Sequence, residues 1–228
     1  LALAASNSDD KIIRNNAVAD FSSNIYYNSN WFANLNVRME EEGVRSNEFR
    51  SIQVAPVNGN DRFFENHYAD LRQLMVGYND DQYKLYVGKF TPKFGYAWQL
   101  GRGAYSDYLA SSYMQRNRIG LGGELKYGDA KKNGRYNLGL SFYKYDRKYL
   151  DNSLLSSYRN VTLGDAEPGA GNGLDSFTIN LDIDFDFASG RDLFYRFAYS
   201  KQNIDDSLML AKYGNGIFSD QSSYSLAM

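Results

Sequence analysis

The sequence predicts an all-β fold, a transmembrane antiparallel β-barrel with about eight strands in this chain. Three observations support this prediction. Apolar and polar residues alternate over long stretches, the connections between these stretches are alternately long and short, and 20 Tyr and 14 Phe occur in a chain of negative mean hydropathy. Side chains on a strand point to opposite faces with a period of two, and strands can span lipid only in a closed barrel, where every backbone group is paired.

The clearest alternation covers residues 174–202. Odd positions from 177 to 187 are all apolar, and the even positions between them are Thr178, Asn180, Asp182, Asp184 and Asp186. After a short turn at 188–191 the alternation resumes. This pattern predicts a long antiparallel hairpin, and each strand has roughly the ten residues needed to cross a bilayer when tilted. Strands of soluble sandwiches are usually shorter.

The N-terminal residues 1–5 resemble the end of a secretory signal, with an A-x-A cleavage site. We therefore expect residues 1–5 to be a signal-peptide remnant and residues 6–228 to form the barrel portion. The alternative is a short disordered tag. A signal remnant implies export from the cytoplasm.

The remaining strands are assigned from the same alternation. Residues 24–40 keep one parity throughout, which predicts a single long strand, although Asn28-Ser29-Asn30 in its middle could be a hairpin turn. The next strand has less distinct faces, because Leu74 and Val76 share parity with Asp70 and Arg72. Strands are predicted near 24–40, 68–78, 82–90, 113–127, from 135, in the hairpin of 174–202, and from 223; long connections are predicted at 41–67, 91–112, 147–173 and 204–218.

The order of connections suggests an orientation and an incomplete barrel. Outer-membrane barrels have short periplasmic turns and long external loops, so we expect the N-terminus in the periplasm. The last sheet strand must pair with the first to remove the edges, yet the sequence stops within an alternating pattern. We therefore expect this chain to be the N-terminal portion of a larger barrel of about sixteen strands.

Composition excludes several classes of protein. The 25 basic and 27 acidic residues give no electrostatic reason to expect a nucleic-acid partner. Without cysteine there is neither a disulfide framework nor thiolate chemistry, which suits passage through an oxidising periplasm. The sequence contains no apolar run of about eighteen residues, so it predicts no transmembrane helix.

Several segments resemble porins of Gram-negative outer membranes. They are YVGKFTPKFGYAW at 86–98, residues 103–108 and 118–122, GRYNLGLSFYKYD at 134–146, and GNGLDSFTINLD at 171–182. The resemblance implies passive diffusion of small hydrophilic solutes or ions, a place in the outer membrane among lipids and lipopolysaccharide, and a homotrimer. In trimeric porins the loop after the fifth strand narrows the channel, which here assigns Asp165 and Glu167 to a constriction loop within 147–173.

Charged residues on the polar parity of the strands are the candidate pore lining. They are Arg38, Lys84, Arg116, Arg118, Arg135, Arg196, Asp182, Asp184 and Asp186. We interpret them as a water-filled lumen with opposed charges, whose field discriminates between solutes. In the alternative interpretation, Arg196 and an aspartate on its partner strand pair and fill a small lumen. The corresponding alternative function is a structural or adhesive barrel with a plugged lumen and external loops that contact a ligand.

The sequence predicts no enzyme, cofactor or metal site. Asp182, Asp184 and Asp186 differ from an EF-hand, because Phe187 stands where the loop glycine belongs and the spacing is that of one strand face. The only histidine, His67, lies in a predicted loop, and no serine or carboxylate constellation accompanies it.

Overall fold

The computed structural model describes residues 2–5, 13–16, 19–41, 62–63, 67–95, 115–146, 169, 173–187, 191–204 and 220–228. Every regular element in these ranges is a β-strand. No helix long and apolar enough to span a membrane occurs in this part of the chain. The all-β prediction is confirmed.

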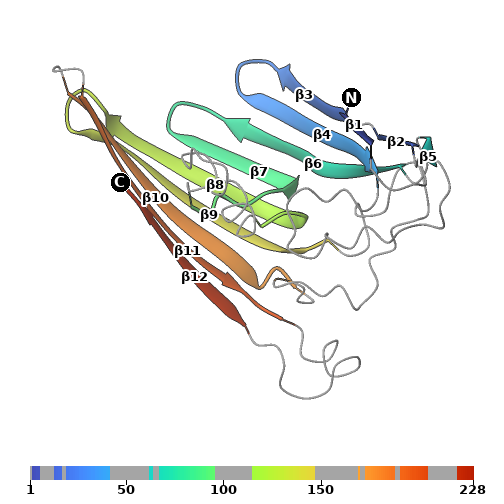
Figure 1. Cartoon of the computed structure of the whole chain (residues 1–228). Coiled ribbons are helices and arrows are strands. Elements are labelled where there is room, and N and C mark those ends of the chain that lie inside the picture. The colour runs from blue at the N-terminus through green and yellow to red at the C-terminus, as the bar shows by residue number, and fades with distance from the viewer. Residues whose placement is uncertain are drawn as a thin grey trace.

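Nine strands form one antiparallel sheet in which each strand pairs with its neighbours in chain order. Figure 1 shows this sheet as a curled surface with β3 and β12 at its two edges. A separate three-stranded sheet contains β1 (Ala2–Ala5), β2 (Ile13–Asn16) and β5 (Arg62–Phe63). The strands of the large sheet are β3 (Ala19–Tyr27), β4 (Trp31–Glu41), β6 (His67–Asn79), β7 (Tyr83–Phe90), β8 (Arg118–Asp129), β9 (Gly134–Tyr145), β10 (Ser176–Phe187), β11 (Arg191–Gln202) and β12 (Gln221–Ala227).

The single strand predicted over residues 24–40 is wrong, because the chain turns back at Asn28–Asn30. Asn28 has a φ of 59°, and its Oδ1 accepts hydrogen bonds from the backbone N–H groups of Asn30 (3.0 Å) and Trp31 (3.2 Å). Asn tolerates this left-handed conformation better than most residues. Three residues separate the paired Tyr27 and Trp31, so the odd-numbered residues stay on one face across the turn. The large sheet therefore has nine strands instead of the eight that were predicted. The first residue of β3 lies at the end of the sheet where the long connections, such as the one between β4 and β6, begin and end.

A β-bulge in β6 explains the mixed parity of residues 68–78. Leu71 lies opposite Val37 and Gln73 lies opposite Asn36, which leaves Arg72 as the extra residue between them. The bulge exchanges the faces on which odd and even residues of β6 lie. The alternation is therefore regular on either side of the bulge.

The two faces of the large sheet differ in chemistry and in exposure. One, here called the apolar face, carries the large hydrophobic side chains and is exposed: Leu125 and Ile25 are each 61% exposed and Leu85 is 55% exposed. The other, here called the polar face, carries most of the polar side chains and is largely buried over β10 and β11, with Thr178 and Ser200 each 1% exposed, whereas its positions on the edge strand β3 are exposed. Exposed members of the apolar face are Phe21, Ile25, Tyr27, Trp31, Leu74, Val76, Leu85, Val87, Leu121, Leu125, Tyr127, Leu138, Leu140, Phe142, Ile179, Phe197, Tyr224 and Leu226.

Candidate functional site

Five charged side chains form a connected group on the polar face, here called the ion ladder: Lys93, Asp182, Arg196, Asp184 and Arg135. Asp182 on β10 lies directly opposite Arg196 on β11, with Arg196 Nε 3.6 Å from Asp182 Oδ1. Arg196 Nη2 also donates to Asp184 Oδ1, and Arg135 on β9 lies opposite Asp184 with Nη2 3.1 Å from Oδ2. Lys93 completes the group through an ion pair with Asp182. Cations and carboxylates alternate, and each carboxylate contacts two cations.

Arg196 is held rigidly at the centre of the ion ladder. Its Nη1 donates to the backbone carbonyls of Ile183 (3.2 Å) and Tyr195 (3.1 Å). Its guanidinium also lies over the ring of Phe194, with Cζ 5.4 Å from the ring centroid. The side chain is 14% exposed. A guanidinium fixed in this way keeps its charge at one place on the polar face.

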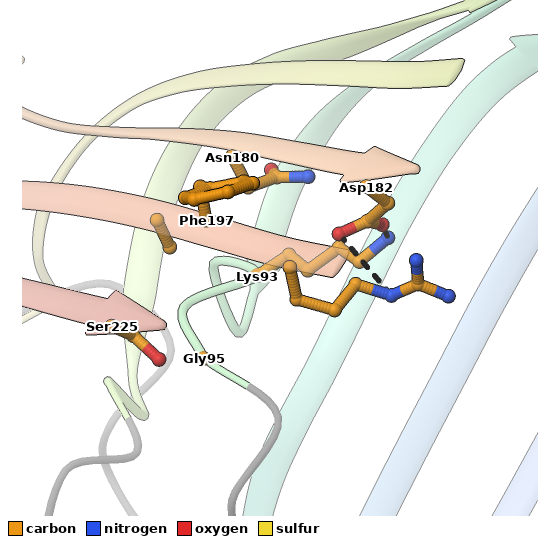
Figure 2. A pocket seen from close by; sticks show the side chains of 8 residues that line it. Lys93, Gly95, Asn180, Asp182, Phe197 and Ser225 are labelled. Carbon is orange, nitrogen blue, oxygen red and sulfur yellow. Dashed lines mark hydrogen bonds and ion pairs between the residues drawn. The ribbon is translucent and has the colours of Figure 1, made fainter. Parts of the chain in front are cut away.

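Lys93 comes from the connection that follows β7 and not from a strand. Residues 91–95 cross the polar face as far as β12, where a Cβ on Gly95 would lie 2.8 Å from Ser225 Oγ. Figure 2 shows the Lys93 side chain reaching the Asp182 carboxylate on β10, whereas Ser225 lies apart from this contact on β12. The sequence predicts a loop here, because residues 91–95 show no strand alternation. Without that alternation the sequence does not indicate which side chains these residues contact.

The other end of the same connection is fastened to the polar face by buried neutral groups. Gln115 Nε2 donates to Ser200 Oγ at 2.6 Å, and the Tyr143 hydroxyl donates to Gln115 Oε1 at 2.5 Å. Tyr143 Oη also lies 2.9 Å from Thr178 Oγ1 and 3.0 Å from Ser200 Oγ. All four side chains are buried. Gln115 precedes the regular part of β8, so the alternation of the sequence does not identify it as part of this group.

Arg118 was predicted as pore lining, and the structure places it away from the ion ladder. It is 3% exposed, its Nη2 donates to Gln202 Oε1 at 2.9 Å, and its guanidinium lies over the Tyr145 ring at 4.9 Å. Its Nη1 donates to the carbonyl of Arg116 at 2.8 Å. Arg116 itself precedes β8, although the predicted strand of 113–127 included it.

The other predicted lining residues are dispersed over the sheet. Lys84 Nζ lies 5.5 Å from the ring centroids of both Phe32 and Tyr86. Arg38 forms a 3.6 Å ion pair with Asp20. Asp186 lies opposite Asp192 near the β10–β11 turn, and its backbone N–H donates to the carbonyl of Ala130 at 2.9 Å. The predicted constriction residues Asp165 and Glu167 lie outside the described residues.

Of the predicted set, the structure therefore brings together Arg135, Arg196, Asp182 and Asp184. The pairing of Arg196 with aspartates of its partner strand, expected under the alternative interpretation, is present. The described ranges contain no group of three or more His, Cys, Asp or Glu side chains arranged to hold a metal ion. The ion ladder is a set of mutually paired charges on the polar face of β9, β10 and β11.

Comparison with known proteins identifies no family. No family model matches the chain, and neither a curated protein nor a solved structure resembles it significantly. The resemblance to porins stays a prediction from the sequence segments.

Proposed function

We propose that this chain is part of a transmembrane β-barrel in a Gram-negative outer membrane, and that the barrel is a passive diffusion pore for small hydrophilic solutes or ions. The observation that carries the proposal is the inverted arrangement of the sheet. Its hydrophobic face is exposed, and its polar face is buried over the central strands, where polar side chains such as Thr178, Asp182 and Ser200 lie. A soluble protein places these faces the other way round.

The apolar face has the extent and composition of a lipid-facing surface. It continues across all nine strands of the sheet, and the strands are 7 to 13 residues long. Water-soluble monomers rarely expose an apolar patch of more than a few hundred Å². Barrel strands in the outer membrane alternate between an apolar exterior and a polar lumen. In a closed barrel the unpaired edges of β3 and β12 would each pair with a further strand.

The ion ladder supports a conducting lumen. Its three cations and two carboxylates are fixed on the face that would line the channel. Fixed charges of both signs create a local field that acts on passing ions and dipolar solutes. The pore would need no cofactor, energy source or catalytic group.

A second candidate is a structural or adhesive barrel whose lumen is plugged. The observation that favours it is the course of the connection between β7 and β8, because both described ends lie on the polar face. Lys93 reaches β10 at one end, and Gln115 reaches β11 at the other. In a closed barrel the described residues at these two ends would narrow the lumen.

Conductance in planar bilayers tests the proposal. The protein is refolded in detergent, checked for β-rich and heat-modifiable behaviour, and added to the bilayer. The diffusion pore predicts stepwise openings in KCl solution. Correctly folded protein that never conducts would favour the plugged barrel, and a stable monomer in plain buffer would contradict the membrane fold itself.

A variant of the connection separates the two candidates. Residues 96–114 are replaced by a Gly-Ser linker of the same length, which removes side chains while both ends stay in place. A diffusion pore conducts before and after the change, whereas a plugged barrel conducts only in the variant. Chemical cross-linking of the refolded protein tests the homotrimer, and addition of lipopolysaccharide to the refolding mixture tests contact with that lipid.

A further inference from the structure

We propose that Lys84, Tyr86 and Glu124 form a binding subsite on the polar face for a small zwitterionic solute such as an α-amino acid. The Lys84 ammonium binds the carboxylate of the solute, and the Glu124 carboxylate binds its ammonium group. The inference deepens the proposed function, because it names a class of solute, and it rests on that function for the way in which the solute arrives.

The strand register places the two charged residues next to each other. Lys84 on β7 lies directly opposite Glu124 on β8, and Tyr86 follows two residues later on the same face of β7. Opposite charges at such positions usually attract each other, because their Cβ atoms are only about 5 Å apart. In the described part of the chain, however, Lys84 and Glu124 form no ion pair with each other or with any other residue.

The Lys84 ammonium is held by two aromatic rings instead of by a carboxylate. Its Nζ lies 5.5 Å from the ring centroids of both Phe32 on β4 and Tyr86, which is within cation–π range. The rings fill the space above two glycines. A Cβ on Gly77 would lie 2.6 Å from Phe32 Cζ, and a Cβ on Gly122 would lie 2.5 Å from Tyr86 Oη. Ring contacts of this kind fix the ammonium and leave its three N–H donors available to a ligand.

The Glu124 carboxylate is held from the opposite side. Asn137 on β9 donates a hydrogen bond from Nδ2 to Glu124 Oε2 at 3.1 Å, so the carboxylate leans towards β9 and away from β7. Glu124 Oε1 accepts no hydrogen bond from the described residues. The neighbouring cation Lys126 is already engaged, because its Nζ donates to Asn79 Oδ1 at 2.7 Å and to the carbonyl of Asp80 at 2.9 Å.

The binding groups reach the surface of the polar face. Lys84, Tyr86 and Glu124 are each half-buried, and the described residues enclose neither the ammonium, nor the tyrosine hydroxyl, nor Glu124 Oε1. A zwitterion can bridge the two charges: its carboxylate accepts from Lys84 and from the Tyr86 hydroxyl, and its ammonium donates to Glu124 Oε1. Charge-assisted hydrogen bonds are stronger than neutral ones. A solute with a single charge would satisfy only one side of the subsite.

Ligand-observed NMR on the detergent-refolded protein tests the subsite. Alanine is the probe, and two analogues are the matched controls. N-acetylalanine keeps the carboxylate without the ammonium charge, and alaninamide keeps the ammonium without the carboxylate. Saturation-transfer signals are titrated for each molecule, and we expect alanine to bind more tightly than either analogue. Equal binding of alanine and either analogue, or no alanine binding, would overturn the proposal.

Variants assign the two charges to the two ends of the solute. We expect Lys84→Met to weaken the binding of alanine and N-acetylalanine about five- to tenfold and to leave alaninamide binding unchanged. Glu124→Gln should weaken the binding of alanine and alaninamide by the same factor and leave N-acetylalanine binding unchanged. Equal changes for all three molecules in either variant would overturn the assignment.

A third variant keeps the test decisive if one of these two does not fold. Tyr86→Phe retains the ring that holds Lys84 and removes only the hydroxyl. It should weaken the binding of alanine and N-acetylalanine about threefold, because one hydrogen bond to the carboxylate is lost. Unchanged binding of both molecules would remove Tyr86 from the subsite and overturn the proposal as stated.

Lys132→Met and Asp129→Asn are the control variants. They change the net charge of the protein by the same amounts as Lys84→Met and Glu124→Gln, but both residues lie at the exposed β8–β9 turn, where they form a 3.9 Å ion pair. Alanine binding should be unchanged in both controls. A loss as large as in Lys84→Met or Glu124→Gln would attribute the effect to overall charge and overturn the subsite.

Binding and conductance fail independently. Selective alanine binding to a protein that never conducts would support the subsite and remove the diffusion pore. Conductance without selective alanine binding would leave the pore in place and overturn the subsite.

Discussion

The ring of Tyr86 on β7 lies over Gly122 on β8, its partner in the register, so that a Cβ on Gly122 would come within 2.5 Å of Tyr86 Cζ. Gly122→Ala should therefore force the ring to move. Overpacking of this kind costs about 1–3 kcal/mol in free energy of unfolding. Urea unfolding of the protein folded into liposomes measures the loss.

Gly123→Ala is the control for this prediction. A Cβ there would lie 2.9 Å from Cδ2 at the flexible end of Leu85, on the apolar face, and 3.2 Å from the backbone oxygen of Lys84. The leucine can change rotamer, so the loss in stability should be smaller than for Gly122→Ala. An equal loss for both variants would show that the Tyr86 contact is not the cause.

Arg196 and Arg135 bind the same Asp184, and their burial predicts unequal contributions to stability. The Arg196 side chain is 14% exposed, and the Arg135 side chain is 60% exposed. Arg196→Gln removes the cation that Asp182 and Asp184 share and leaves them with Lys93 and Arg135 alone, so it should cost about 1.5–3 kcal/mol. Arg135→Gln removes an exposed ion pair and should cost about 1 kcal/mol or less. Unfolding midpoints of the two variants in urea give the comparison.

The Tyr143 hydroxyl joins the connection after β7 to β10 and β11. Tyr143→Phe should lower stability by about 1–3 kcal/mol, because buried polar groups lose a partner. Tyr136→Phe on the same strand removes only an exposed 3.2 Å hydrogen bond to the carbonyl of Asn133, and its effect should be small. Hydrogen exchange of the Gln115 side-chain amide provides a second readout, which should accelerate only in Tyr143→Phe.

The β6–β7 turn should weaken in acid because of Asp80. Its carboxylate accepts backbone hydrogen bonds from Tyr83 and Gln82, both at 2.8 Å, and the Tyr83 bond is the main cause that holds the pKa of Asp80 below its usual value of 3.8. A lowered folded-state pKa stabilises the protein above the unfolded-state pKa, and this contribution is lost as the pH falls through the folded-state pKa.

The variant Asp80→Asn keeps an acceptor oxygen and removes the titration. Its unfolding midpoint should therefore depend less on pH than that of the unaltered protein between about pH 5 and pH 2, the range in which aspartate titrates. Parallel acid-dependence curves for the two proteins would exclude Asp80 as a contributor.

A charged substitution on the apolar face should lower stability much more if this face contacts lipid than if it contacts water. Leu140 lies in the middle of β9 and is 41% exposed. Leu140→Arg should cost about 2–4 kcal/mol if this position faces the centre of a bilayer. If it faced water, the same change should stay within about 0.5 kcal/mol. Folding into liposomes is measured for Leu140→Arg and for Ser22→Arg, an exposed polar-face position that should tolerate arginine.

Residue alternation was sufficient to predict most of the sheet. Each strand lies between an apolar and a polar environment, so successive residues alternate between apolar and polar side chains. The hairpin of β10 and β11 shows this most clearly. Alternation did not reveal the turn at Asn28–Asn30, since a turn with an odd number of residues leaves the parity unchanged. The alternation also changes parity at Arg72, because a bulge adds one residue to β6 there.

The candidate site was predictable only where it lies on regular strands. Asp182, Asp184, Arg196 and Arg135 were assigned to the polar face from their parity, and the register then determined their contacts. Lys93 and Gln115 lie in a connection without a period. Their contacts depend on the path of the chain across the sheet, which local sequence does not encode.

The fastening of this connection has a consequence for the order of assembly. The strands of the large sheet pair with their chain neighbours, so each pairing closes only the short or long connection between two successive strands. Lys93 and Asp182 are 89 residues apart, and Gln115 and Ser200 are 85 apart. Neither contact can form before β10 and β11 are in place, because its partner residue belongs to one of those strands. We therefore expect the two described ends of the connection between β7 and β8 to dock late, after β10 and β11 have joined the sheet.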